Sequence, residues 1–135
     1  QLSDGGLWAN NPSLVAVTEA LTRLGAERSA IRLLSIGTGI GKNYYPLSKS
    51  DKKWGFLNGW GISKFISMLL NLQAATASNV TQLILEKHQS VRVNFESDLP
   101  LSLDDVSTID DLISRADRDF THNSAAIRQL LGRNQ

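Results

Sequence analysis

The sequence predicts an α/β fold from three features. A helix with clear start and stop signals covers residues 12–24, a short apolar strand covers 31–36, and an alternating strand covers 91–95 after a long helical stretch. Strands separated by helices usually pair in parallel, because a parallel connection has to cross back over the sheet. The unbroken apolar run at 31–36 is typical of such a strand buried on both faces.

The composition is that of a folded chain with no sign of nucleic-acid or metal binding. The 135 residues suit one domain or part of a larger one, and 41% of them are hydrophobic, which is enough for a core. The net charge is only +1, so no nucleic-acid polymer is expected as a partner. The chain has no cysteine, and its two histidines, His88 and His122, lie far apart. We therefore expect no disulfide, no metal site and no cofactor.

The first residues contain neither an initiator methionine nor the basic-then-apolar pattern of a signal peptide. We therefore expect a piece of a longer protein, with any targeting information in the remainder. A cytoplasmic or peripheral-membrane location is the corresponding expectation.

The first helix is the best-marked element. Asn11 suits the N-cap and Pro12 the first helical position, where a missing N–H costs nothing. Apolar residues then recur at helical spacing, and Gly25 is a typical stop. These apolar residues are Leu14, Val17, Leu21 and Leu24.

The stretch after the first strand is predicted to be a loop. Residues 37–42 contain three glycines, but the P-loop pattern fails at Ile36 and the dinucleotide pattern fails at Lys42. We interpret it as a tight turn near an active site. The loop continues through an aromatic-rich segment whose rings either contact lipid, form a lid or pack over the core. Its aromatic residues are Tyr44, Tyr45, Trp54, Phe56 and Trp60.

Three further helical segments are expected. Residues 61–87 form either one long helix or two with a break near Ser78, and polar residues interrupt the apolar face too often for a membrane span. Ser107 or Thr108 is expected to cap a helix that begins at Ile109. A separate final helix is expected over 124–131.

A short motif near the start is the strongest candidate for chemistry. Asp4 is followed by Gly5 and Gly6, and glycines allow sharp turns through conformations closed to other residues. Such a turn can hold a carboxylate at the rim of a sheet, although Asp-Gly-Gly alone is most often only a turn. The motif runs through Leu7-Trp8-Ala9-Asn10-Asn11-Pro12 into the first helix, and the next strand ends in Gly37-Thr38-Gly39.

This arrangement resembles the patatin-like phospholipase family, in which an Asp-Gly-Gly or Asp-Gly-Ala motif supplies the catalytic aspartate. In that family an Asn-Asn-Pro helix start and a strand ending in Gly-Thr-Gly follow the motif. The resemblance covers residues 3–39 closely and 90–112 loosely. It implies that Asp4 belongs to a Ser–Asp dyad and that Gly5 and Gly6 form the positioning turn. It also implies a three-layer α/β/α sandwich, of which residues 1–135 are the C-terminal half of a single domain.

The serine that such a dyad needs is not recognisable in this chain. The family's serine lies in a Gly-x-Ser-x-Gly elbow and its oxyanion hole in a glycine-rich loop, and both precede the aspartate. Ser35 lacks the first glycine of the elbow, and Ser63 lacks the second. We therefore expect the N-terminal half of the same protein to supply these groups, and this chain alone to be inactive.

The resemblance implies a lipid acyl hydrolase, of phospholipase A type or acting on acyl esters more generally, with a lipid substrate and a membrane surface as partners. Asp4 would be the base that activates the serine. Two other hypotheses stay open: a patatin-like effector regulated by a signalling nucleotide, and a non-catalytic binding or structural fragment. Ligand-dependent activation would distinguish the first, and an upstream sequence without the serine elbow would favour the second.

Overall fold

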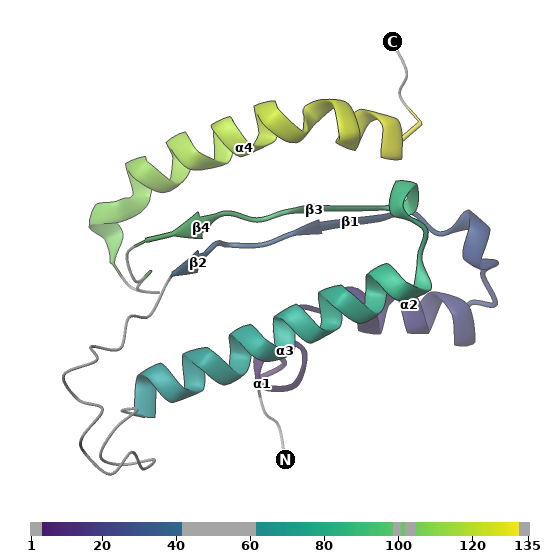
Figure 1. The fold of residues 1–135 in the computed structure, drawn as a ribbon, viewed down its shortest axis with the longest axis horizontal. Coiled ribbons are helices and arrows are strands. Elements are labelled where there is room, and N and C mark those ends of the chain that lie inside the picture. The colour runs from purple at the N-terminus through teal and green to yellow at the C-terminus, as the bar shows by residue number, and fades with distance from the viewer. Residues whose placement is uncertain (1–3, 42–61, 99–100, 102–104, 133–135) are drawn as a thin grey trace.

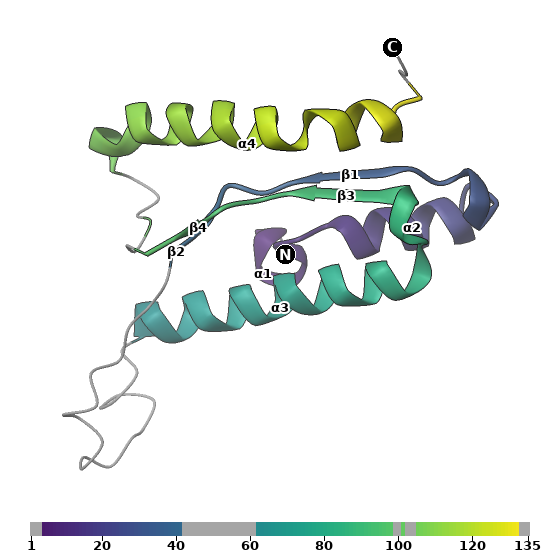
Figure 2. The ribbon, with the colours of Figure 1, turned by 45° about the horizontal axis from the view of Figure 1, so that its top comes forward.

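A computed structural model of the chain describes residues 4–41, 62–98, 101 and 105–132. The strands form a middle layer, with α4 on one side and α2 and α3 on the other (Figure 1, Figure 2). The predicted α/β class is therefore confirmed. In chain order the elements are α1 (Gly6–Ala9), α2 (Ser13–Thr22), η1 (Arg28–Ala30), β1 (Leu33–Ile36), β2 (Ile40–Gly41), α3 (Ile62–Ile84), η4 (Lys87–Gln89), β3 (Ser90–Val93), β4 (Glu96–Ser97), η5 (Val106–Thr108) and α4 (Ile109–Leu130).

The strands form two short parallel pairs. β1 pairs with β3, so that Ser35 lies opposite Arg92, and β2 pairs with β4, so that Ile40 lies opposite Glu96. The parallel direction agrees with the sequence prediction. The prediction of a continuous loop from Gly37 onward was partly wrong, because this stretch contains β2.

Two glycines allow the chain to pass from β1 to β2 around Asn94 and Phe95. The Gly37 N–H donates to the Val93 carbonyl at 2.8 Å, and the Gly39 N–H donates to Asn94 Oδ1 at 2.9 Å. A methyl group at Gly37 would overlap the Asn94 side chain, and one at Gly39 would overlap the Phe95 ring. Gly39 also has a φ of +96°, which side chains disfavour. The Gly-Thr-Gly segment is thus explained by close packing inside the fold.

The ends of α2 agree with the sequence signals to within two residues. The helix begins at Ser13, with Pro12 rather than Asn11 at the N-cap position, so the predicted start was one residue early. Asn11 still supports this start, because its Oδ1 accepts the Ser13 N–H at 3.2 Å. Gly25 has a φ of +62° just after the helix, and the next N–H, from Ala26, turns back to the Ala20 carbonyl.

The other two long helices are each continuous. α3 is one helix, which resolves the alternative that the sequence left open, and α4 runs unbroken from Ile109 to Leu130, so the separate helix expected over 124–131 was wrong. Thr108 precedes α4 without a capping side-chain bond. Instead, Asp105 accepts from the hydroxyl and N–H of Ser107 at the start of η5, and these bonds lower the pKa of Asp105. No helix in the described ranges is long and apolar enough to cross a membrane.

The described core is small compared with the apolar surface around it. Its buried hydrophobic residues are Val17, Ala74, Ala77, Leu85 and Leu130, whereas fourteen large hydrophobic residues are exposed. Ile36 at the end of β1 is 74% exposed, so the expectation of a strand buried on both faces was wrong. The physical reason is that β1 has only β3 beside it among the described residues, which leaves its carboxyl end with few neighbours.

The close packing of Gly39 predicts an unequal cost for two glycine substitutions. Gly25→Ala should cost about 1 kcal/mol, because Gly25 has a positive φ but no atom within 4 Å of an added methyl group. Gly39→Ala should cost about 1–3 kcal/mol more, because its methyl group also overlaps Phe95. Urea unfolding of both variants would measure the difference, and equal costs would mean that the Phe95 contact is unimportant.

Candidate active site

Asp4 lies immediately before α1, at a position that its own carboxylate helps to build. Asp4 Oδ1 accepts the Gly6 N–H at 2.7 Å, and the Asp4 carbonyl accepts the Leu7 N–H at 3.1 Å. These bonds curl the chain into the single turn of α1. Asp4 is exposed, and its Oδ2 has no hydrogen-bond donor within the described ranges. One carboxylate oxygen is therefore held by the backbone while the other is available.

The two glycines act differently from the expectation. Gly5 has φ −60° and ψ −28°, which any residue adopts, and Gly6 has no positive φ either. The prediction that this turn needs conformations closed to other residues was therefore wrong. At Gly6 the constraint is space, because a methyl group there would lie 3.1 Å from Asp4 Oδ1. Gly6 thus allows the carboxylate to approach the backbone closely.

A glutamine of α3 holds α1 in place. Gln73 Oε1 accepts the Asn10 N–H at 3.1 Å, and Gln73 Nε2 donates to the carbonyls of Trp8 at 2.6 Å and Leu7 at 3.3 Å. In the sequence, Gln73 is one of the polar residues that interrupt the apolar face of the helical stretch 61–87. That position was the available signal, because a polar side chain on a packed face normally has a specific partner.

Asn11 makes a second junction with α3. It is 4% exposed, and its Nδ2 donates to the Ala74 carbonyl at 3.0 Å. Its Oδ1 accepts from the hydroxyl of Ser13 at 2.6 Å, and Ser13 Oγ in turn lies 3.0 Å from Ser35 Oγ. Asn11 therefore connects the start of α2 with α3 and, through Ser13, with β1.

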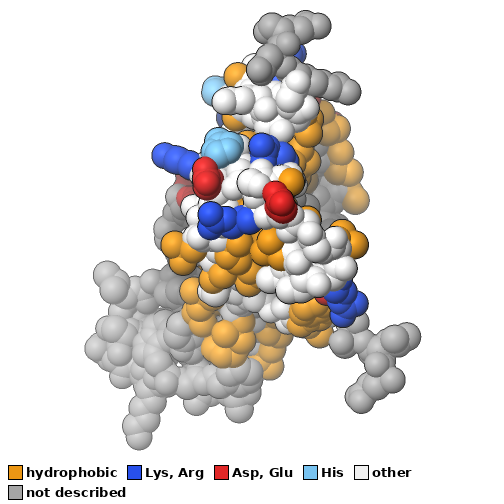
Figure 3. Space-filling view, turned by 90° about the vertical axis from the view of Figure 1, so that its right-hand side faces the viewer, with side chains coloured by type: hydrophobic (Ala, Val, Ile, Leu, Met, Phe, Trp, Pro, Cys, Tyr) orange, Lys and Arg blue, Asp and Glu red, His pale blue; other side chains and the backbone are white. Residues whose placement is uncertain are grey.

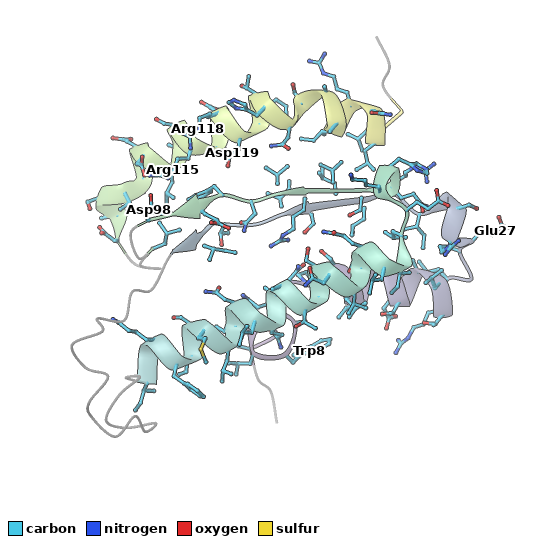
Figure 4. The ribbon with its side chains drawn as sticks, viewed as in Figure 1. Trp8, Glu27, Asp98, Arg115, Arg118 and Asp119 are labelled. Atoms are coloured by element: carbon cyan, nitrogen blue, oxygen red, sulfur yellow. The ribbon has the colours of Figure 1, made fainter. Side chains whose placement is uncertain are left out.

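Exposed apolar side chains follow Asp4 on α1 and lie on α3, which α1 contacts. Leu7 and Trp8 of α1 are 64% and 63% exposed, and Leu69 and Leu72 are exposed on α3, the helix that α1 contacts. Trp8 lies on the α1 side of the molecule, away from the strands (Figure 4). An available carboxylate beside an exposed apolar surface suits an apolar substrate better than a strongly hydrated one.

The other candidates from the sequence lie elsewhere. His88 Nδ1 is 3.5 Å from Glu86 Oε2 in η4, and His122 Nδ1 bonds the Arg118 carbonyl on α4. The described part of the chain holds no group of three or more side chains suited to a metal ion. The aromatic residues proposed as lipid or lid contacts lie outside the described residues; they are Tyr44, Tyr45, Trp54, Phe56 and Trp60.

Comparison with known proteins gives one informative similarity. The chain is 23% identical over 136 residues to a cUMP-AMP-activated phospholipase of Escherichia coli. The matched region covers 97% of this chain and 41% of that protein, so the chain spans about two fifths of its relative's length. No protein-family profile matches the chain, and no solved structure matches it.

The role of Gln73 can be tested by replacing it with leucine. Gln73→Leu leaves one N–H and two carbonyls of residues 7–10 without their partner. We expect the free energy of unfolding to fall by only about 1–2 kcal/mol, because water replaces part of the lost hydrogen bonding. Hydrogen exchange should accelerate at the α1 amides. Asn79→Leu on the same helix is the control, because the exposed Asn79 side chain makes no hydrogen bond with described residues. Unchanged exchange at α1 in Gln73→Leu would contradict the anchoring role.

Proposed function

We propose that the protein is a phospholipase-type lipid acyl hydrolase and that Asp4 is the aspartate of its Ser–Asp dyad. The observation that carries this proposal is the Asp4 carboxylate, held through Oδ1 by the Gly6 N–H with Oδ2 available. The similarity to a phospholipase along nearly the whole chain supports the reaction class. The exposed apolar side chains of Leu7 and Trp8 beside Asp4 support a lipid as the substrate.

The proposed mechanism uses the two carboxylate oxygens differently. Asp4 Oδ2 accepts the proton of a serine hydroxyl, and the serine oxygen attacks the ester carbonyl. The ester C–O bond then breaks, the leaving alcohol takes the proton from Asp4, and an acyl-enzyme remains. In the second step Asp4 accepts a proton from a water molecule that attacks the acyl-enzyme, the bond to the serine oxygen breaks, and the proton passes to the serine as the fatty acid leaves. The Gly6 N–H on Oδ1 keeps the carboxylate oriented during both steps, so that the proton transfer needs little rearrangement.

We further propose that this chain is the C-terminal part of a single patatin-like domain. The nucleophilic serine and the oxyanion donors then belong to the preceding half of the protein. Two observations support this arrangement: the chain spans about two fifths of its relative's length, and large hydrophobic residues away from the Asp4 turn, such as Ile36 and Leu83, are exposed in the described part of the chain. On this proposal residues 1–135 alone have no hydrolase activity, because a base without a nucleophile and oxyanion donors performs no acyl transfer.

A second candidate adds regulation to the same chemistry. The similar protein is activated by cUMP-AMP, which favours a nucleotide-activated phospholipase over one that is always active. Hydrolysis with and without the cyclic dinucleotide distinguishes these two forms. A non-catalytic fragment is the remaining alternative, and an upstream half without a Gly-x-Ser-x-Gly elbow would favour it.

The dyad proposal predicts a specific loss of turnover in Asp4→Asn. In the complete protein, we expect phospholipid hydrolysis to fall by about 10³-fold or more, since the amide cannot accept the serine proton. Asp117→Asn is the matched control, because Asp117 is an exposed acidic residue of α4. This helix lies on the other side of the strands from α1, which follows Asp4 (Figure 1). Its activity should stay near that of the original protein.

The opposite result in Asp4→Asn would contradict the dyad role. Asp4→Asn also retains the oxygen that accepts the Gly6 N–H, so its thermal unfolding should change little. Full activity in a folded Asp4→Asn protein would refute the dyad role and leave Asp4-Gly5-Gly6 as a simple turn. Labelling of the serine by a fluorophosphonate probe in the complete protein reports separately whether the nucleophile is present.

A further inference from the structure

A cavity of about 450 Å³ lies between the last turns of α3 and the strands β1 and β3. It is separate from Asp4, because α1 is anchored on α3 at Gln73 whereas the cavity is lined by α3 from Ser78 onward. Its volume is in the range of cavities that bind small molecules. Glu86 and Lys87 line it near the beginning of the strands, and Figure 3 shows basic, acidic and histidine side chains together at this end of the molecule.

The sheet face that borders this cavity is unusually polar. Alternate residues of a strand face opposite sides, and the cavity is lined by Ser35 of β1 and by Ser90 and Arg92 of β3. Leu33 is the only apolar strand residue in the lining. The intervening residues Leu34, Val91 and Val93 are apolar, and α4 covers the other face of the strands (Figure 2). Packing against α3 alone would favour apolar residues on this side.

Arg92 is held in a fixed orientation at the cavity wall. Its Nη1 donates to Ser35 Oγ at 2.6 Å. Ser13 has one hydroxyl proton, and Asn11 Oδ1 accepts it at 2.6 Å, so Ser35 is the donor across the 3.0 Å separation from Ser13. This leaves Ser35 Oγ free to accept from Arg92. The chain of bonds from Arg92 to Asn11 therefore fixes the guanidinium through one N–H and leaves its other donors available.

Among the described residues that line the cavity, the positive charges of Arg92 and Lys87 exceed the single negative charge of Glu86. Arg92 is half-buried and Lys87 is exposed, and neither forms an ion pair within the described ranges. Glu86 also lines the cavity, and its carboxylate Oε2 lies 3.5 Å from His88 Nδ1. A half-buried guanidinium without a counter-ion favours the binding of an anion.

We propose that this cavity binds a phosphate group, as a mono- or diester carried by a small molecule or a lipid. The planar guanidinium of Arg92 matches two phosphate oxygens, Lys87 adds a second positive charge, and the hydroxyls of Ser78 and Ser90 are additional donors. The rest of the cavity would hold the organic group to which the phosphate is esterified. The site is independent of Asp4, so it stands or falls separately from the proposed hydrolysis.

Binding to the complete protein tests this site with two kinds of probe. AMP, with adenosine as its phosphate-free control, represents a soluble phosphate ester, and phosphatidylglycerol vesicles represent a lipid headgroup. Calorimetry and vesicle sedimentation measure the two affinities. In Arg92→Gln we expect the affinity for at least one probe to fall about ten-fold or more, since the charged hydrogen bonds are lost. Arg32→Gln is the matched control, because the exposed Arg32 side chain donates, among the described residues, only to the carbonyls of Ser29 and Ile31.

Each outcome of these binding experiments either supports or overturns the phosphate site. An Arg92-dependent affinity for AMP but not adenosine identifies a soluble phosphate ester, and an Arg92-dependent affinity for vesicles alone identifies a headgroup. A folded Arg92→Gln protein that binds both probes like the original overturns the site, as does an equal loss in Arg32→Gln. If Arg92→Gln does not fold, Lys87→Gln replaces it, because exposed Lys87 can lose its charge without disturbing the packing.

Discussion

The buried Asn11 side chain is the constraint on which the described structure depends most. Its amide donates to the α3 backbone at Ala74 and accepts from Ser13 at the start of α2, so one side chain joins two helices. Because it is only 4% exposed, water cannot replace these partners at low cost. The Asn-Asn-Pro segment is therefore important for a mechanical reason: Asn11 fixes where α2 begins relative to α3, and Asn10 binds Gln73 next to it.

The position of Asp4 follows from this junction. Only six residues separate Asp4 from Asn11, and four of them form α1. Once Asn10 and Asn11 are fixed on α3, α1 has little freedom, and the Asp4–Gly6 bond fixes the carboxylate relative to α1. The carboxylate is thus placed by contacts with residues more than sixty positions later in the chain. On the proposed function, the Asp4 carboxylate is a catalytic group on a short, exposed turn, and such a group needs this support to keep its geometry.

The sequence predicted elements whose signals are local, and it missed features that depend on partners far along the chain. The stop signal at Gly25, just after α2, and the alternation at 91–95 are local and were recognised. β2 and β4 have two residues each, too few for any periodic pattern, and exist because Gly37 and Gly39 let the strands pass around Asn94 and Phe95. The sequence also did not predict that α4 is one continuous helix. Its polar middle looks like a break until its packing against β1 and β3 is known.

The same distinction explains what the sequence could say about the site. Asp4 was predicted as a site residue because its motif resembles that of a known family. The conformational role assigned to Gly5 and Gly6 was wrong, since glycine content alone does not reveal whether a turn needs a positive φ or simply space. Arg92 and Ser35 are separated by 57 positions and meet only through the parallel register of β1 and β3. The hydrogen bonds of Asn11 support both of the proposed sites. Asn11 bonds α3 next to Gln73, which holds the turn of the dyad aspartate, and through Ser13 and Ser35 it orients the arginine of the phosphate site, so both sites depend on one buried amide.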